Sequence, residues 1–134
     1  MSRVAVTDTH ALLWWSLGPL KKLGRQARNI FSLAESGQAT VYIPVLAFVE
    51  IAEAMRRGAF PGAPAFSRWT AQVLASSNFL AADLTADVIV EADSLYSIPE
   101  RGDRLIAATA VHLGYPLITR DPALTNVYGL KTVW

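Results

Sequence analysis

The chain has 134 residues, a formal net charge of +1 and a hydrophobic content of 52%, which fits a single domain, residues 1–134, with a core of its own. Because it contains no cysteine and only two histidines, disulfides, thiolate metal sites and cysteine nucleophiles are excluded, and a histidine-rich zinc site is disfavoured. No apolar stretch approaches the roughly 20 residues that span a bilayer, and no signal peptide is evident, so we expect a cytoplasmic protein with no membrane partner.

Short apolar runs alternate with amphipathic segments along the chain, which is the pattern of strands alternating with helices. Read in chain order, the expected strands are residues 4–7, 40–43, 78–81, 117–119 and 130–133. The expected helices are residues 11–15, 20–36, 44–57 and 66–75, a helix opened by Thr85, and residues 103–113. This alternation predicts an α/β fold, with a central, mostly parallel sheet of four to five strands that helices cover on both faces.

Four acidic residues stand where such a sheet would gather them. Asp8 and Asp121 follow the first and fourth expected strands, and Asp103 opens the helix that leads into the fourth. Glu50 lies in an otherwise apolar helix, but helical side chains tilt toward the N-terminus, so it can reach the same edge of the sheet. Carboxylates crowded in one cleft repel one another and predict a hard divalent cation, Mg²⁺ or Mn²⁺, that activates water for attack on a phosphodiester.

Each acid also has a structural explanation that involves no chemistry. Asp8, Asp103 and Asp121 all stand where the N-cap of a helix would, and a capping role is as consistent with any one of them as catalysis. Glu50 can belong to a solvated stripe along its helix. It is the convergence of all four at one edge that favours the metal site.

Four blocks of the chain resemble the PIN-domain ribonucleases, and the resemblance is greatest to the VapC-type toxins of toxin–antitoxin pairs. The blocks are residues 8–15 (DTHALLWW), 50–52 (EIA), 103–110 (DRLIAATA) and 119–121 (TRD). The resemblance covers nearly the whole chain and implies a PIN-like α/β/α sandwich. It further implies that the acidic metal site for Mg²⁺ or Mn²⁺ is made by Asp8, Glu50, Asp103 and Asp121, and that Thr119 orients a ligand or a water.

The same resemblance implies a hydrolase, an endoribonuclease that cuts RNA and leaves 5′-phosphate and 3′-hydroxyl ends. Its partners would be a cognate antitoxin that inhibits it, a second copy in a homodimer, and promoter DNA bound only through the antitoxin in a hetero-oligomer. The hydrophobic excess of the chain suggests an apolar groove for that antitoxin. We expect Trp14, Trp15 and Phe48 to contribute to this groove, with Trp14 and Trp15 serving as core and groove lining rather than stacking on RNA bases.

The chain departs from the family pattern near two of the acids, and two other functions stay open. Relatives often carry an aromatic residue directly before the glutamate, where this chain has Val49, and an aspartate three residues before the third acid, where it has Glu100. One alternative function is a catalytically idle PIN-like interaction module. The other is an aspartyl-phosphate phosphatase with Asp8 as nucleophile, which needs an acid two residues later, where the chain has His10. A general-base role for His10 is less consistent with its position than packing or solvation.

Overall fold

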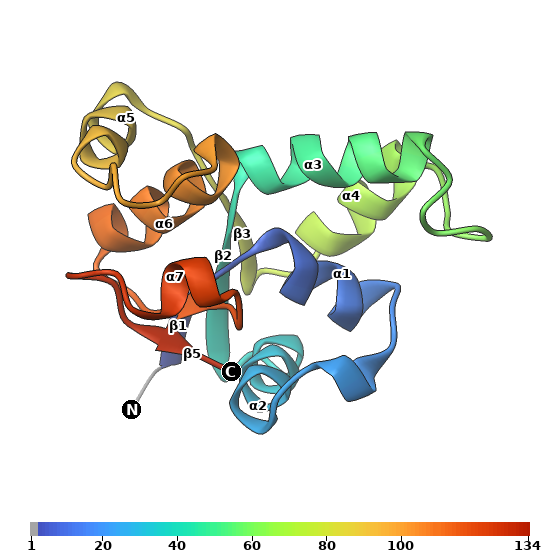
Figure 1. The fold of residues 1–134 in the computed structure, drawn as a ribbon. Helices are drawn as coiled ribbons and strands as arrows, with labels where there is room; N and C mark the ends of the chain where they lie inside the picture. Colours follow the sequence, from blue (N-terminus) through green and yellow to red (C-terminus); the bar gives the residue numbers. More distant parts are fainter. Residues whose placement is uncertain (1–2) are drawn as a thin grey trace.

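A five-stranded, all-parallel sheet forms the centre of the computed structural model, which describes residues 3–134 (Figure 1). The strands are β1 (Arg3–Thr7), β2 (Ala39–Pro44), β3 (Phe79–Ala82), β4 (Leu117–Ile118) and β5 (Thr132–Val133). Their order across the sheet is β3-β2-β1-β4-β5, so the first strand of the chain lies in the middle. The expected α/β fold with a parallel sheet is confirmed, and all five expected strands form.

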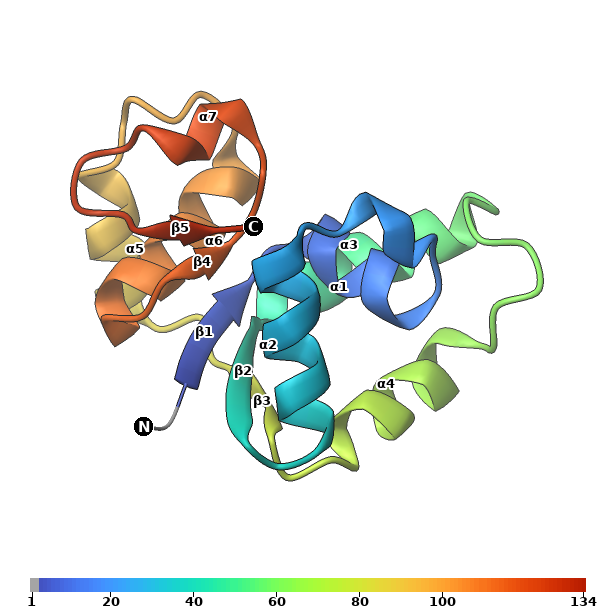
Figure 2. The same cartoon turned by 90° about the horizontal axis from the view of Figure 1, so that it is seen from below.

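Helices cover both faces of this sheet, which confirms the α/β/α arrangement (Figure 2). They are α1 (Thr9–Ser16), the 3₁₀ helix η1 (Leu20–Lys22), α2 (Arg25–Glu35), α3 (Val45–Arg56), α4 (Phe66–Leu74), α5 (Ala86–Asp93), α6 (Arg101–Leu113) and α7 (Pro122–Thr125). Successive residues of β1 serve opposite faces, because Ala5 packs in a cluster with α1 to α4 while Val6 packs in a second cluster with α5 and α6. Within residues 3–134, no helix is long and apolar enough to cross a membrane.

The single helix expected over residues 20–36 is wrong at its start, because the chain forms η1 there and begins α2 only after Gly24. Gly24 lies against Trp134, so a Cβ atom at this position would come within 2.6 Å of the Trp134 Cδ1 and would overlap its carbonyl carbon. The Gln26 amide donates a hydrogen bond of 3.1 Å to the Trp134 carbonyl. A residue far away in the sequence therefore caps α2, which has no side-chain cap of its own.

The start of α6 also differs from the expectation. Glu100 is its N-cap, and the carboxylate accepts hydrogen bonds from the amides of Gly102 at 3.0 Å and Asp103 at 2.7 Å. The helix therefore begins at Arg101, and the interpretation of Asp103 as an N-cap is wrong. Pro44, expected in the first turn of a helix, instead ends β2 directly before α3.

The contact between Gly24 and Trp134 leads to a stability prediction. Gly24→Ala should lower the free energy of unfolding by about 2 kcal/mol, because the added methyl group overlaps the backbone of Trp134 and forces the two segments apart. Ser32→Ala, at an exposed position of α2, is the matched control and should change stability by less than about 0.5 kcal/mol. Urea unfolding measures both, and equal stability of the two variants would show that the contact is not maintained in solution.

Candidate functional site

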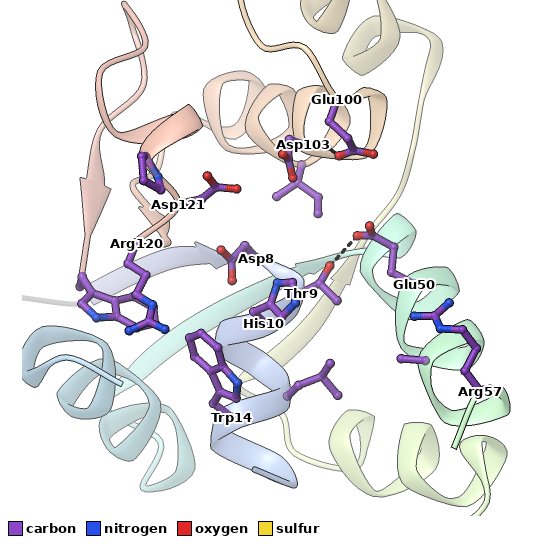
Figure 3. Close-up of a pocket in the computed structure, with 15 residues that line it drawn as sticks. Asp8, Thr9, His10, Trp14, Glu50, Arg57, Glu100, Asp103, Arg120 and Asp121 are labelled. Atoms are coloured by element: carbon purple, nitrogen blue, oxygen red, sulfur yellow. Dashed lines mark hydrogen bonds between the residues drawn. The ribbon is translucent and has the colours of Figure 1, made fainter. Parts of the chain in front are cut away.

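A cavity of about 490 Å³ lies beyond the carboxyl ends of β1 and β4 (Figure 3). Five carboxylates line it: Asp8, Glu50, Glu100, Asp103 and Asp121. Figure 3 shows Asp8, Asp103 and Asp121 pointing toward a common space, with Glu50 and Glu100 beside it. The structure thus brings all four predicted acids into one cavity and adds Glu100.

Two of the acids are held in the cavity by the helices that they cap. Asp8 is the N-cap of α1, and its Oδ1 accepts a hydrogen bond of 2.8 Å from the Ala11 amide. Asp121 is the N-cap of α7, and its Oδ1 accepts one of 2.9 Å from the Ala123 amide. The predicted capping roles of both residues are confirmed, and both side chains line the cavity as well.

Glu50 is anchored by a different element. The Thr9 hydroxyl, on α1, donates a hydrogen bond of 2.6 Å to its Oε1. Its other carboxylate oxygen, Oε2, lies near the start of α6, because a Cβ atom added to Gly102 would stand 3.2 Å from it. The same Cβ would stand 3.0 Å from a carboxylate oxygen of Glu100. Gly102 therefore leaves room for two carboxylates that a larger residue would push apart.

Thr119 connects two of the aspartates. This residue is 1% exposed, and its hydroxyl accepts a hydrogen bond of 3.1 Å from the Asp121 amide. The Thr119 side chain also lies near Asp8 and lowers the pKa of that carboxyl. Thr119 therefore fixes Asp121 next to Asp8, whose amide donates a hydrogen bond to the carbonyl of the preceding residue, Ile118. Its implied action on a ligand or a water stays a prediction.

Burial and mutual repulsion raise the pKa of most of these acids. Burial is the largest cause for Asp8 and for Glu50, whose pKa values both lie above their ordinary range despite their hydrogen bonds. Burial, followed by the charges of Glu100 and Asp121, raises the pKa of Asp103 to about 6. The pKa of Glu100 is instead lowered, mainly by its hydrogen bond from the Asp103 amide. The cavity therefore disfavours negative charge and would gain from a bound cation.

The donor set fits a hard divalent metal ion. The five carboxylates offer only oxygen atoms, which suit Mg²⁺ and Mn²⁺ rather than ions that prefer nitrogen or sulfur. Among residues 3–134, no three carboxylate or imidazole side chains lie close enough together to make a ready coordination shell. Mg²⁺ tolerates this spacing, because it commonly takes one or two carboxylates and keeps several of its waters. Asp8, Asp103 and Asp121, which point toward a common space, would hold such an ion directly or through its waters.

The three predicted groove residues lie in different surroundings. Trp14 lines the acidic cavity, whereas Trp15 lines a second cavity of about 210 Å³ between α1, α2, α4 and β3. Phe48 lies on α3, and its ring packs edge-on at 6.1 Å from Trp69, which also lines the second cavity. Trp69 thus contacts Phe48 and shares the second cavity with Trp15, whereas Trp14 lines the acidic cavity. Their contact with an antitoxin stays a prediction.

Three basic and aromatic residues that line the acidic cavity together with the acids are not predicted from the sequence. These residues are Arg57, at the end of α3, together with Arg120 and Trp134. Arg120 stands directly between Thr119 and Asp121, so its place beside a predicted site residue was the available signal. No sequence signal points to Trp134, because its position depends on contacts with α2.

Comparison with known proteins gives one family and several related folds. The family model described as "PIN domain" matches residues 5–130 of the chain. No curated protein sequence matches it at a significant level.

Among solved structures, VapBC2 from Rickettsia felis, bound to a DNA fragment from its promoter, is similar with a TM-score of 0.69 and 15% identity, covering 97% of both chains. A toxin–antitoxin complex from Klebsiella pneumoniae has a TM-score of 0.63 and 19% identity, covering 97% of this chain and 96% of the other. FitAcB from Neisseria gonorrhoeae has a TM-score of 0.62 and 16% identity, with the same coverage of 97% and 96%. At these identities the likeness establishes the fold.

The raised pKa of Asp103 makes stability depend on pH. The folded protein holds the Asp103 proton more tightly than the unfolded chain does, so the free energy of unfolding should fall as pH rises from about 3.8, the ordinary value, to about 6. Asp103→Asn removes this titration. Without metal the variant should therefore be more stable than the wild type above pH 6, by about 1 kcal/mol after allowance for solvent screening of a partly exposed group, and should lose the advantage near pH 4.

Urea unfolding in EDTA between pH 4 and pH 7 measures this difference. Asp93→Asn, which changes an exposed aspartate at the end of α5, is the control for the loss of one charge. A stability difference between Asp103→Asn and the wild type that stays constant over this pH range would contradict the repulsion in the cavity.

Proposed function

Because this chain belongs to the PIN-domain family, we propose that it is a metal-dependent endoribonuclease that acts as the toxin of a toxin–antitoxin pair. PIN domains are generally nucleases, which supports hydrolysis of a phosphodiester. The observation that carries the proposal is the cavity in which five carboxylates converge at the carboxyl edge of the sheet. Acids with raised pKa values in such a place are costly to the folded protein, and a functional site is the usual reason to maintain them.

A divalent ion bound among Asp8, Asp103 and Asp121 would neutralise the acids, activate a water molecule and stabilise the charge that develops on the phosphate. Asp8 and Asp121 are fixed for this role by the amides that they cap. Glu50 suits the removal of a proton from the attacking water, since burial raises its pKa toward neutrality. Its Oε1 is occupied by the Thr9 hydroxyl, so Oε2 is the atom that would receive the proton.

The proposed partners are supported by what the similar solved structures contain. The similar structure from Klebsiella pneumoniae is a toxin–antitoxin complex, and VapBC2 from Rickettsia felis is bound to a DNA fragment from its promoter. We therefore propose a cognate antitoxin as partner, a homodimer within a hetero-oligomer, contact with promoter DNA only through the antitoxin, and action in the cytoplasm. The second cavity, lined mainly by apolar side chains that include Trp15, Trp69 and Val73, is the part of the surface that suits an apolar antitoxin segment.

Cleavage of RNA in the presence of Mg²⁺ or Mn²⁺ is the first test. EDTA should abolish it, and Asp8→Asn should lower the rate by about two orders of magnitude because a charge that holds the ion is lost. Asp93→Asn should leave the rate unchanged, because this residue lies on α5 outside the cavity. The ends of the products, read by labelling, should be 5′-phosphate and 3′-hydroxyl.

A second readout does not depend on activity. Mn²⁺ should raise the melting temperature of the wild type more than that of Asp103→Asn, because the ion binds the folded protein through the acids. Full cleavage in EDTA would disprove the metal mechanism, and no cleavage of any RNA by the wild type would favour the idle interaction module.

Antitoxin binding can be tested at the second cavity. Val73→Arg places a charge among apolar residues of this cavity, so it should weaken binding of the antitoxin encoded next to the gene by at least about tenfold while RNA cleavage is retained. Ala71→Arg, at an exposed position of the same helix outside the cavity, is the matched control and should bind normally. Calorimetric titration measures both, and normal binding by Val73→Arg would place the antitoxin elsewhere.

A further inference from the structure

An arginine is held between two indole rings at the edge of the acidic cavity. The guanidinium carbon of Arg120 lies 4.7 Å from the centre of the Trp14 ring and 5.6 Å from that of the Trp134 ring. The two rings themselves meet edge-on at 5.8 Å. All three side chains line the cavity, and Figure 3 shows Arg120 at the same end of the cavity as Asp8 and Asp121.

Three separate elements build this arrangement. Trp14 comes from α1, Arg120 from the segment after β4, and Trp134 from the residue after β5. Trp134 is fixed in turn by its close approach to Gly24 and by the hydrogen bond from the Gln26 amide. The guanidinium therefore sits in a defined place, and less conformational entropy is lost when it binds a ligand.

Contact through ring faces leaves the hydrogen-bonding capacity of Arg120 available. A cation–π contact acts through the charge of the guanidinium and not through its five N–H groups, so it does not consume them as hydrogen-bond donors. Arg104 provides the contrast, because its guanidinium donates to the carbonyls of Ile98 at 2.8 Å and Pro99 at 3.0 Å and so holds the loop before α6. Arg104 serves the fold, whereas Arg120 presents its donors at the cavity.

An RNA strand that approaches the acidic cavity needs a cationic side chain beside it. Five carboxylates line the cavity, and a single divalent ion offsets only part of their charge, so they would still repel an RNA phosphate. Arg120 precedes Asp121 directly and is thus adjacent to the acids. A guanidinium also matches the geometry of a phosphate, which it can bind through two parallel hydrogen bonds.

We propose that Arg120, held between Trp14 and Trp134, binds a phosphate of the RNA strand beside the acidic cavity and so positions the strand for cleavage. This inference rests on the proposed ribonuclease function. It also assigns Trp14 a role, because its ring is in contact with Arg120 and with the Lys22 ammonium, 5.5 Å from the ring centre. Trp14 supports cations that face the strand and does not itself stack on an RNA base.

The test uses the full chain with Asp8→Asn, so that a fluorescein-labelled single-stranded RNA stays intact in Mg²⁺. Fluorescence anisotropy gives its dissociation constant over a range of salt concentrations. Adding Arg120→Gln should weaken binding by about tenfold, as expected for the loss of one charge-assisted phosphate contact. The logarithm of the binding constant should also depend less steeply on the logarithm of the salt concentration, with a slope smaller in magnitude by about 0.7. Arg120→Lys keeps the charge without the planar donors and should recover part of the affinity.

Arg68→Gln is the matched control, since it removes an exposed arginine on α4 that does not line the cavity, and its binding should be unchanged. In the cleavage-competent chain, Arg120→Gln should raise KM about tenfold and change kcat less. Equal affinity and equal salt slope for Arg120→Gln and Arg68→Gln would overturn the inference, as would failure of the Asp8→Asn chain to bind RNA. Absence of cleavage by the wild type overturns the proposed function instead, and the binding comparison still decides the role of Arg120.

Discussion

Repulsion among the five carboxylates of one partly buried cavity is the constraint that the surrounding structure has to accommodate. Backbone amides do much of this, because Asp8, Glu100 and Asp121 each accept hydrogen bonds from the N–H groups at the start of a helix. Those N–H groups have no partner within the helix, so one set of bonds satisfies the helix end and fixes the acid. For Asp8 and Asp121, capping and a place in the cavity are therefore compatible, since each caps with Oδ1 alone and has a second oxygen to present.

The order of the strands brings the acids together. β1 and β4 are neighbours although most of the chain separates them, and Thr7 is in register with Ile118. The Asp8 amide donates to the Ile118 carbonyl at 3.1 Å, and the next residue, Thr119, binds the Asp121 amide. These two hydrogen bonds thus hold two strand ends and two aspartates in one arrangement. The helices α3 and α6 then complete the cavity with Glu50 and Asp103.

Features set by local sequence could be predicted, and features set by distant contacts could not. The strands and the convergence of the four acids follow from apolar runs and from the geometry of parallel sheets. The start of α2 depends on Trp134, and nothing near Gly24 announces that contact. The sequence predicts the start of α6 two residues too late, because its N-cap is Glu100, and capping is more common for acids with shorter side chains.

The different positions of the two adjacent tryptophans are also hard to predict from the sequence. Trp14 and Trp15 read as one apolar pair, yet successive residues of a helix point about 100° apart, so the two rings face different cavities. The contact of Arg120 with Trp134 is also hidden in the sequence, because it requires three distant elements to meet. A resemblance to known motifs identifies the residues within each block and not the distant residues that complete them.

The four tryptophans of the chain form two pairs that line different cavities. Trp14 and Trp134 line the acidic cavity, and Trp15 and Trp69 line the second one. Indole emission responds to the polarity and charge of its surroundings, so each cavity contains its own optical reporter without any added dye. Replacing either pair by phenylalanine leaves a protein whose ultraviolet fluorescence follows occupancy of the other cavity alone. The molecule can thus distinguish spectroscopically between a ligand at the acids and one at the apolar cavity.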